Sequence, residues 1–234
     1  MAQKKLVRFA EIKSFPNVFE YPTEMKDNWR NCFNNKNDIV LELACGKGEY
    51  AVGLGEMFPG KNFIGVDIKG NRIWKGAKTA LEKQLSNVAF LRTQIDKIAD
   101  YFTKDEVSEI WITFPDPQLR TSKAKKRLTH PKFLRMYQEI LRKDGFVHLK
   151  TDSPALYNFT KLVIETYGLS VAEDINDVHS MQQVPGVLQI KTHYEGLDIA
   201  KSNRIHYLKF TLDKELPRDK DDLLKTLISE QEKA

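Results

Sequence analysis

Short apolar runs recur along the chain from residue 38 onward and predict the strands of a sheet. They are DIVLELA (38–44), NFIGVDI (62–68), VAFLRT (88–93), VSEIWITF (107–114) and GFVHLKT (145–151). The earlier runs are apolar at successive positions, which is typical of parallel strands that are buried on both faces. We therefore expect these segments to form the centre of a parallel sheet.

Amphipathic segments lie between these runs and predict helices that cover the sheet. The clearest spans residues 130–142, with Thr129 as candidate N-cap and Gly145 as the stop. Its apolar residues share one helical face: Phe133, Leu134, Tyr137, Ile140 and Leu141. The alternation of strand and helix implies right-handed crossovers and a doubly wound, Rossmann-like α/β fold with helices on both faces of the sheet.

The chain beyond residue 151 predicts one more helix and two more strands. Residues 153–168 have a helical pattern, whereas LSVAEDI (169–175) and RIHYLKFTL (204–212) have strand patterns. The sheet is then mostly parallel and seven-stranded, with ligands expected at the carboxyl ends of its strands.

We expect one domain over residues 36–213. An N-terminal extension (1–35) precedes it, and a charged C-terminal tail (214–234) follows as a solvated helix or a loose segment.

The composition excludes several classes of protein. With 234 residues, 41% hydrophobic and 29% charged, the chain is typical of soluble globular proteins. Neither a signal peptide nor an apolar run near the roughly 18 residues of a membrane span is present, so we expect a cytoplasmic protein with no membrane partner. Cys32 and Cys45 form no CxxC motif and lie beside no histidine cluster, so we expect no metal site.

A glycine turn follows the first predicted strand in LELACGKGEYAVGLGE (41–56). Gly46 and Gly48 allow a tight turn that a ligand can approach, and the helix after it offers free N–H groups. Asp67 ends the next strand 21 positions after Gly46, where a carboxylate can accept hydrogen bonds from both hydroxyls of an adenosine ribose. Dinucleotides and S-adenosylmethionine both fit this pattern.

A second carboxylate, Glu42, lies in the strand before the turn and favours S-adenosylmethionine. An uncompensated carboxylate would repel the pyrophosphate of a dinucleotide by about 1 kcal/mol or more at an effective dielectric constant near 20. S-adenosylmethionine has no phosphate and carries a sulfonium and an ammonium instead. The alternative for Glu42 is a strand residue that faces a Lys or Arg. Gln94, after the third strand, is a candidate contact for the adenine amino group.

The fourth predicted strand leads into a carboxylate between two prolines and then into a basic segment, FPDPQLRTSKAKKR (114–127). Pro115 and Pro117 fix the backbone around Asp116. In a doubly wound sheet this strand lies beside the first, so we expect Asp116 near the reactive methyl group. The density of the cations that follow suits contacts with phosphates better than the reading of bases. The alternatives are a turn-forming aspartate and an ordinary charged loop.

Together these motifs resemble those of the bacterial tRNA (guanine-N7)-methyltransferases. The resemblance covers about residues 40–210 and rests on LELACGKGEY, FIGVDIKGNRI, FPDPQLRTSKAKKRL, HLKTD and THYE, in that order. It implies a class I methyltransferase fold, the cofactor S-adenosylmethionine with S-adenosylhomocysteine as product, and methylation of the variable-loop guanine at tRNA position 46. It names no obligate protein partner, and we expect a monomer or a homodimer.

The resemblance also implies roles for individual residues. Asp116 takes the catalytic position. The cofactor-binding positions are Glu42, Gly46, Gly48, Asp67, Gln94 and Asp116. The substrate-binding positions are Arg120, Asp152, Thr192, His193, Tyr194 and Glu195. The RNA-binding positions are Ser122, Lys123, Ala124, Lys125, Lys126 and Arg127. Gln118 and Ala44 depart from the family pattern, which often has Trp and Gly there, and Gln94 stands where many members have Asp.

The chemistry of guanine N7 agrees with these residue types. N7 is a neutral lone pair, so its methylation needs alignment of the reactants more than a strong base. The guanine edge with N1–H and the 2-amino group consists of donors, which the carboxylates of Asp116, Asp152 and Glu195 can accept. Two alternatives stay open: an RNA methyltransferase that acts on an exocyclic amine, and a non-catalytic RNA-binding module.

Overall fold

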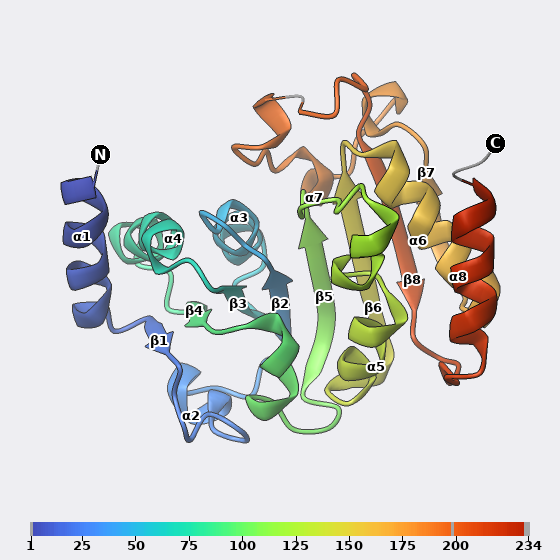
Figure 1. Ribbon diagram of the computed structural model, residues 1–234. Coiled ribbons are helices and arrows are strands. Elements are labelled where there is room, and N and C mark those ends of the chain that lie inside the picture. Colours follow the sequence, from blue (N-terminus) through green and yellow to red (C-terminus); the bar gives the residue numbers. More distant parts are fainter. Residues whose placement is uncertain (1, 198, 232–234) are drawn as a thin grey trace.

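An eight-stranded sheet forms the centre of the computed structural model, which describes residues 2–197 and 199–231 (Figure 1). The strand order is β1-β4-β3-β2-β5-β6-β8-β7, with parallel pairs from β1 to β6 and antiparallel pairs at β8. The strands are β1 (Val18–Glu20), β2 (Ile39–Leu43), β3 (Asn62–Asp67), β4 (Val88–Arg92), β5 (Val107–Thr113), β6 (Leu141–Thr151), β7 (Val171–Ile175) and β8 (His206–Thr211).

Helices cover both faces of this sheet. The α-helices are α1 (Ala2–Glu11), α2 (Trp29–Phe33), α3 (Glu49–Met57), α4 (Gly70–Glu82), α5 (Pro131–Gln138), α6 (Pro154–Tyr167), α7 (Gly186–Gln189) and α8 (Lys220–Gln231). Short 3₁₀ helices are η1 (Ile12–Ser14), η2 (Ile95–Asp100), η3 (Thr121–Lys126), η4 (Val178–Ser180) and η5 (Glu195–Leu197). No helix in these described ranges is long and apolar enough to cross a membrane.

Successive residues of the central strands point into two separate cores. Leu41 and Ile64 pack in one core with apolar residues of α5, α6 and α8. Val40 and Phe63 pack in the other core with residues of α3 and α4. All residues of β2 and β3 are buried, which confirms the prediction of parallel strands covered on both faces.

The sheet has eight strands where the sequence predicts seven, because part of the N-terminal extension joins it. Residues 18–20 pair in parallel with β4, and Val18 lies opposite Phe90. Trp29 is fully buried, and its indole Nε1 donates to the carbonyl oxygen of Tyr101 at 2.9 Å. A strand of three residues is too short to show a period in the sequence.

The predicted helix over residues 130–142 is wrong at its C-terminal end. α5 ends at Gln138, and Leu141 already belongs to β6, where it pairs with Val107. Gly145 lies within β6 and is no helix stop; a Cβ there would lie 2.8 Å from the carbonyl oxygen of Ser108. The N-cap is His130, whose Nδ1 accepts from the Lys132 N–H at 3.0 Å.

Of the two predictions for the C-terminal tail, a helix is confirmed over residues 220–231, but it is not solvated on all sides. Leu224 and Ile228 on α8 are 1% and 8% exposed and pack in the core that α6 also lines. Arg135 of α5 donates to both carboxylate oxygens of Asp221. The segment LLKTLI (223–228) has apolar residues at helical spacing, but its burial depends on distant parts of the fold that the local pattern does not contain.

Two neighbouring leucines test how firmly α8 is held. Leu224→Ala should lower the free energy of unfolding by about 2–5 kcal/mol, because it leaves a cavity in the core. Leu223, which is 52% exposed, is the matched control, and its change to alanine should cost less than about 0.5 kcal/mol. Urea titrations of both variants measure the difference, and equal losses would contradict the packing of α8.

Candidate active site

A cavity of about 490 Å³ lies at the carboxyl ends of β2, β3 and β4. Its wall includes Asp67, Ala44, Thr93 and Gln94. The two oxygens of Asp67 accept from the backbone N–H groups of Gly46 at 2.9 Å and Lys69 at 2.8 Å. A carboxylate has about four lone-pair sites, so Asp67 is fixed in place and keeps acceptor capacity toward the cavity. The volume suits a ligand the size of a nucleoside.

The glycine turn beside this cavity adopts a backbone that favours glycine. Gly46 and Gly48 have φ angles of 56° and 70°, in the left-handed region. A Cβ on Gly48 would also overlap the Phe90 ring. Ala44, where many members of the resembled family have glycine, shares the left-handed conformation with a φ of 55°.

Glu42 lies beneath the turn and is 3% exposed. Its oxygens accept from the Ala51 N–H at 2.8 Å and the Thr113 hydroxyl at 3.1 Å, so it connects β2 to α3 and β5. Burial raises the pKa of this carboxyl to about 8. Because the protonated form is favoured at neutral pH, the charge on Glu42 does not discriminate against a pyrophosphate as the sequence analysis expects. Glu42 faces hydrogen-bond donors, and neither a Lys nor an Arg is among these partners.

The turn after β5 presents Asp116 on the surface. Phe114 and Gln118 bracket it with φ angles of 45° and 47°, both in the left-handed region. Asp116 is exposed, and its Oδ1 accepts from the Gln118 N–H at 3.0 Å. Gln118 itself lines the cavity that contains Asp67. The turn therefore adjoins the candidate cofactor cavity, as the order of strands predicts.

Arg127 holds this turn from the protein side. Its guanidinium donates to the carbonyl oxygens of Pro117, Gln118 and Leu119 at 3.1–3.3 Å. It also lies 4.4 Å from the centre of the Phe159 ring, and the residue is only 6% exposed. This buried position does not suit the direct RNA contact expected from the sequence. It suits the positioning of the turn.

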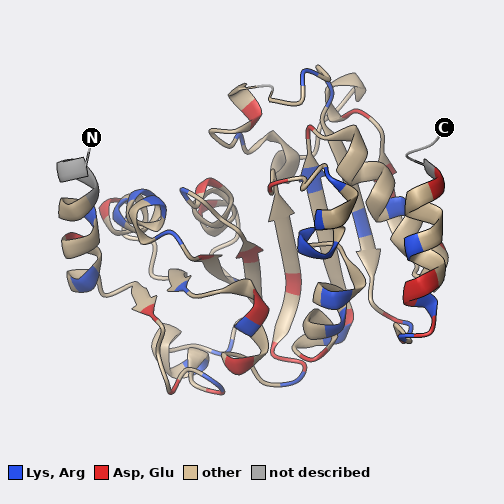
Figure 2. Ribbon diagram, in the orientation of Figure 1, with Lys and Arg blue, Asp and Glu red and all other residues tan. Residues whose placement is uncertain are grey.

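The rest of the basic segment divides into exposed and buried residues. Ser122, Lys123, Lys125 and Lys126 are exposed on η3, whereas Ala124 is 6% exposed and packs in the core. Ala124 is thus an anchor for η3 and does not offer its side chain to RNA. Lys125 and Lys126 also line the cavity of Asp67. Arg120, which precedes η3, is exposed. Figure 2 shows the cations of this segment gathered around η3.

Residues 192–195 lie near the glycine turn, although they are about 145 positions away in the sequence. Thr192 is buried, and its hydroxyl accepts from the Glu195 N–H at 3.1 Å. The His193 N–H donates to Glu49 at 3.4 Å, at the start of α3. A Cβ on Gly46 would lie 3.7 Å from the Tyr194 ring. The structure therefore brings this predicted substrate segment against the predicted cofactor turn.

Lys150 is a candidate positioning residue that the sequence analysis does not assign. Its ammonium is fully buried and donates to the carbonyl oxygens of Leu188 (2.9 Å) and Ile190 (3.1 Å) and to Glu195 (2.9 Å). It fixes the segment that leads to residues 192–195 against the end of β6. The sequence contains a feature that could have identified this residue: a lysine inside the apolar run HLKT. A charge buried in a strand must find partners within the fold.

Asp152 follows β6 at the same edge of the sheet. Its Oδ2 accepts from the Ala200 N–H at 3.2 Å, and its carbonyl oxygen accepts from the Ser202 hydroxyl at 2.8 Å. Because β5 and β6 are neighbours, Asp116 and Asp152 follow the ends of adjacent parallel strands. Across residues 2–197 and 199–231, no group of three or more His, Cys, Asp or Glu side chains could hold a metal ion.

Replacement of Glu42 by glutamine tests the buried carboxyl. The folded-state pKa is raised from about 4.5 to about 8, so the folded protein keeps a proton that the unfolded chain releases between these values. The free energy of unfolding should therefore fall by up to about 1.4 kcal/mol per pH unit across that window. Glu42→Gln should remove this contribution, because the amide does not titrate.

Urea titrations of both proteins at several pH values measure these slopes. Identical slopes for the wild type and Glu42→Gln would show that Glu42 is ionised in the folded protein.

Comparisons with known proteins agree with this geometry. The model of a family described as a putative methyltransferase matches residues 36–208. The tRNA (guanine-N(7)-)-methyltransferase of Bacteroides thetaiotaomicron is 47% identical, over 92% of this chain and 88% of that protein. The protein of the same name from Porphyromonas gingivalis is 46% identical, over 86% of each chain.

Solved structures show the same fold at much lower identity. The crystal structure of the 16S rRNA methyltransferase KamB superposes with a TM-score of 0.60 at 14% identity, covering 79% of this chain and 92% of that one. Such a low identity supports the fold alone, whereas the two relatives above share almost half of their residues with this chain. The chain belongs to the tRNA (guanine-N7)-methyltransferase family.

Proposed function

We propose that this protein transfers a methyl group from S-adenosylmethionine to N7 of a guanine in tRNA, giving 7-methylguanosine. One observation carries the proposal: the cavity that contains Asp67 is also lined by Gln118, Lys125 and Lys126. A nucleoside-sized cavity, the turn of Asp116 and the basic segment thus meet at one edge of the sheet. The relatives, named as tRNA (guanine-N(7)-)-methyltransferases, support tRNA as the substrate.

The residues at the carboxyl ends of β2, β3 and β4 fit S-adenosylmethionine. Asp67 would accept from the ribose hydroxyls, the turn of Gly46 and Gly48 would allow close approach, and Gln94 would face the adenine. When bound, S-adenosylmethionine supplies an electrophilic methyl group on its sulfonium. Glu42 supports the turn from below, and its predicted direct cofactor contact has no support from its buried position.

The residues that contact the guanine would serve to orient N7 toward the methyl group. Asp116 is exposed, while the Gln118 N–H and the clamp of Arg127 fix its turn, so its carboxylate is ready to accept from a donor edge. Asp152 follows β6, the neighbour of β5, and Arg120 follows Asp116 in the same loop, so we place both on the guanine side of the site. Such fixed contacts lower the barrier by orientation, which can supply several kcal/mol.

Residues 192–195 complete the proposed guanine site from the other side. Glu195 is held by Lys150, so we assign it first to the placement of this segment and then to the guanine edge. The exposed residues Ser122, Lys123, Lys125 and Lys126 would contact RNA phosphates. We further propose position 46 in the variable loop as the target, a cytoplasmic location, and a monomer or homodimer with no obligate protein partner.

Methylation of an unmodified tRNA transcript tests the proposed function. The purified protein with S-adenosylmethionine should form 7-methylguanosine, detected by mass spectrometry of nucleosides, and a transcript with adenosine at position 46 should not be methylated. Asp116→Ala should lower kcat by at least about 100-fold, because the base loses its alignment. Its affinity for S-adenosylhomocysteine, measured by calorimetry, should stay nearly unchanged.

Other products would favour other functions. An exocyclic N-methylguanosine or N-methyladenosine would favour the amine-methylating alternative. Failure of the wild type to bind S-adenosylhomocysteine would favour a non-catalytic RNA-binding module.

Arg127→Lys separates a positioning role from RNA contact. The change keeps the charge but removes the planar fork that holds three carbonyl oxygens. We expect kcat to fall about 10- to 100-fold, while the salt dependence of tRNA binding stays the same. Lys123→Glu should do the reverse, with weaker binding and a shallower salt dependence. A changed salt dependence in Arg127→Lys with normal kcat would restore Arg127 as an RNA contact.

A further inference from the structure

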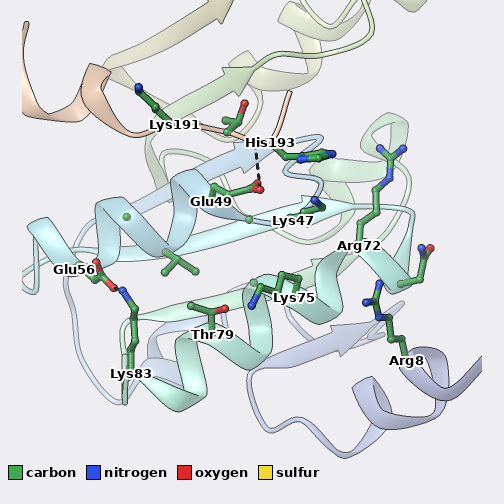
Figure 3. Close-up of a pocket in the computed structure, with 16 residues that line it drawn as sticks. Arg8, Lys47, Glu49, Glu56, Arg72, Lys75, Thr79, Lys83, Lys191 and His193 are labelled. Carbon is green, nitrogen blue, oxygen red and sulfur yellow. Dashed lines mark hydrogen bonds and ion pairs between the residues drawn. The ribbon is translucent and has the colours of Figure 1, made fainter. Parts of the chain in front are cut away.

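A second basic surface lies in a groove of about 1010 Å³ between α3 and α4 (Figure 3). We call it the α3–α4 groove. The cations that line it come from four parts of the chain: Arg8, Lys47, Arg72, Lys75, Lys83 and Lys191. Two carboxylates, Glu49 and Glu56, also line it. Neither the cofactor cavity nor the basic segment of η3 includes these residues.

The two carboxylates leave most of the positive charge uncompensated. Glu56 forms an ion pair with Lys83, and Glu49 accepts from the backbone N–H of His193. Lys47, Lys75 and Lys191 form no ion pair with any described residue. Arg72 and Arg8 lie over aromatic rings, which leaves their charge in place. The groove therefore presents a net positive surface to solvent.

The cations on α4 form a row. Arg72 and Lys75 occupy positions i and i+3 of α4, and Thr79 follows at i+7; Lys83, directly after the helix at i+11, continues the row but is paired with Glu56. This spacing places them on one face of α4, along about 16 Å at 1.5 Å per residue. With Arg8, Lys47 and Lys191, these cations are spread over a groove of about 1010 Å³, which is larger than a single small anion needs.

One end of the groove reaches the candidate active site. Gly48 of the cofactor turn, Thr192 and His193 line it together with the cations. The guanidinium of Arg72 lies 5.6 Å from the centre of the Tyr194 ring, so the row on α4 begins at the predicted substrate segment. Any chain that leaves the site in this direction would pass directly over the row.

The groove and η3 lie on opposite faces of the sheet. α4 packs in the core that contains Val40 and Phe63, whereas Ala124 of η3 packs in the core that contains Leu41 and Ile64. Basic surfaces therefore lie on both sides of the candidate active site at the carboxyl edge of the sheet. A substrate that extends across this edge would contact both the α3–α4 groove and η3. Contacts with η3 alone would hold the substrate on one face of the sheet only.

We propose that the α3–α4 groove binds the phosphodiester backbone of the substrate RNA at nucleotides away from the methylated guanine. The proposal rests on the proposed function, since it takes RNA as the substrate. A protein partner would need an apolar or aromatic centre in its interface. The side chains that line this groove are mainly cationic or polar, and cations in such a row are what phosphates require.

Binding measurements on a double variant test the proposal. Lys75→Gln with Lys191→Gln should weaken binding of an unmodified tRNA transcript at least about tenfold in a filter-binding assay. Each lost phosphate contact removes about 0.7–0.9 from the slope of log affinity against log salt, so this slope should fall by about 1.4–1.8. The matched control is Lys104→Gln with Lys143→Gln, which removes the same charge from exposed lysines near the amino ends of β5 and β6. The control should bind tRNA like the wild type.

The outcomes separate the groove from the proposed function. Equal tRNA affinity and salt slope in the groove and control variants would overturn the groove proposal, even while the wild type still forms 7-methylguanosine. A wild type that binds no tRNA would overturn both proposals. A loss of affinity without any change of salt slope would also overturn the groove as a phosphate site. Unchanged affinity for S-adenosylhomocysteine and unchanged melting of both variants exclude misfolding as the cause of weaker binding.

Discussion

Polar side chains buried at the carboxyl edge of the sheet are the constraint on which the site depends. A buried charged or polar group that lacks a partner costs several kcal/mol, so each must be satisfied within the protein. Glu42 accepts from α3 and β5, Asp67 holds the glycine turn, Arg127 holds three carbonyl oxygens of the proline turn, and Lys150 holds the segment near Glu195. The loops of the site are therefore positioned by the same groups that burial forces to find partners.

The fold could be predicted from the sequence where the hydrophobic pattern admits one interpretation. Residues 39–43 and 62–67 are apolar at nearly every position, and strands buried on both faces are the simplest explanation of such short runs. The prediction failed where an element depends on distant partners. β1 has three half-buried residues, and α8 buries only Leu224 and Ile228 fully. Their stability comes from β4 and α6, which no local window contains.

In the candidate site, too, some features could be predicted from the local sequence and others depend on distant partners. The sequence predicted the turn of Asp116 beside the candidate cofactor cavity, because strand order alone places both at one edge of the sheet. It did not separate Arg127 from Lys123, although the two lie four residues apart in one basic run. The difference is burial: Arg127 reaches the carbonyl oxygens of residues 117–119, while Lys123 points to solvent. The partner of a cation is a property of the tertiary structure.

The N-terminal extension gains a role from this arrangement. Its helix α1 places Arg8 over the Trp74 ring of α4, at 4.6 Å, and its strand β1 lengthens the sheet beside β4. Both contacts lie on the side of the molecule that carries the α3–α4 groove. An extension that only capped the sheet would not need a cation in that groove, whereas Arg8 contributes one to its wall. Residues before position 36 therefore contribute both to the sheet and to the positive charge of the α3–α4 groove.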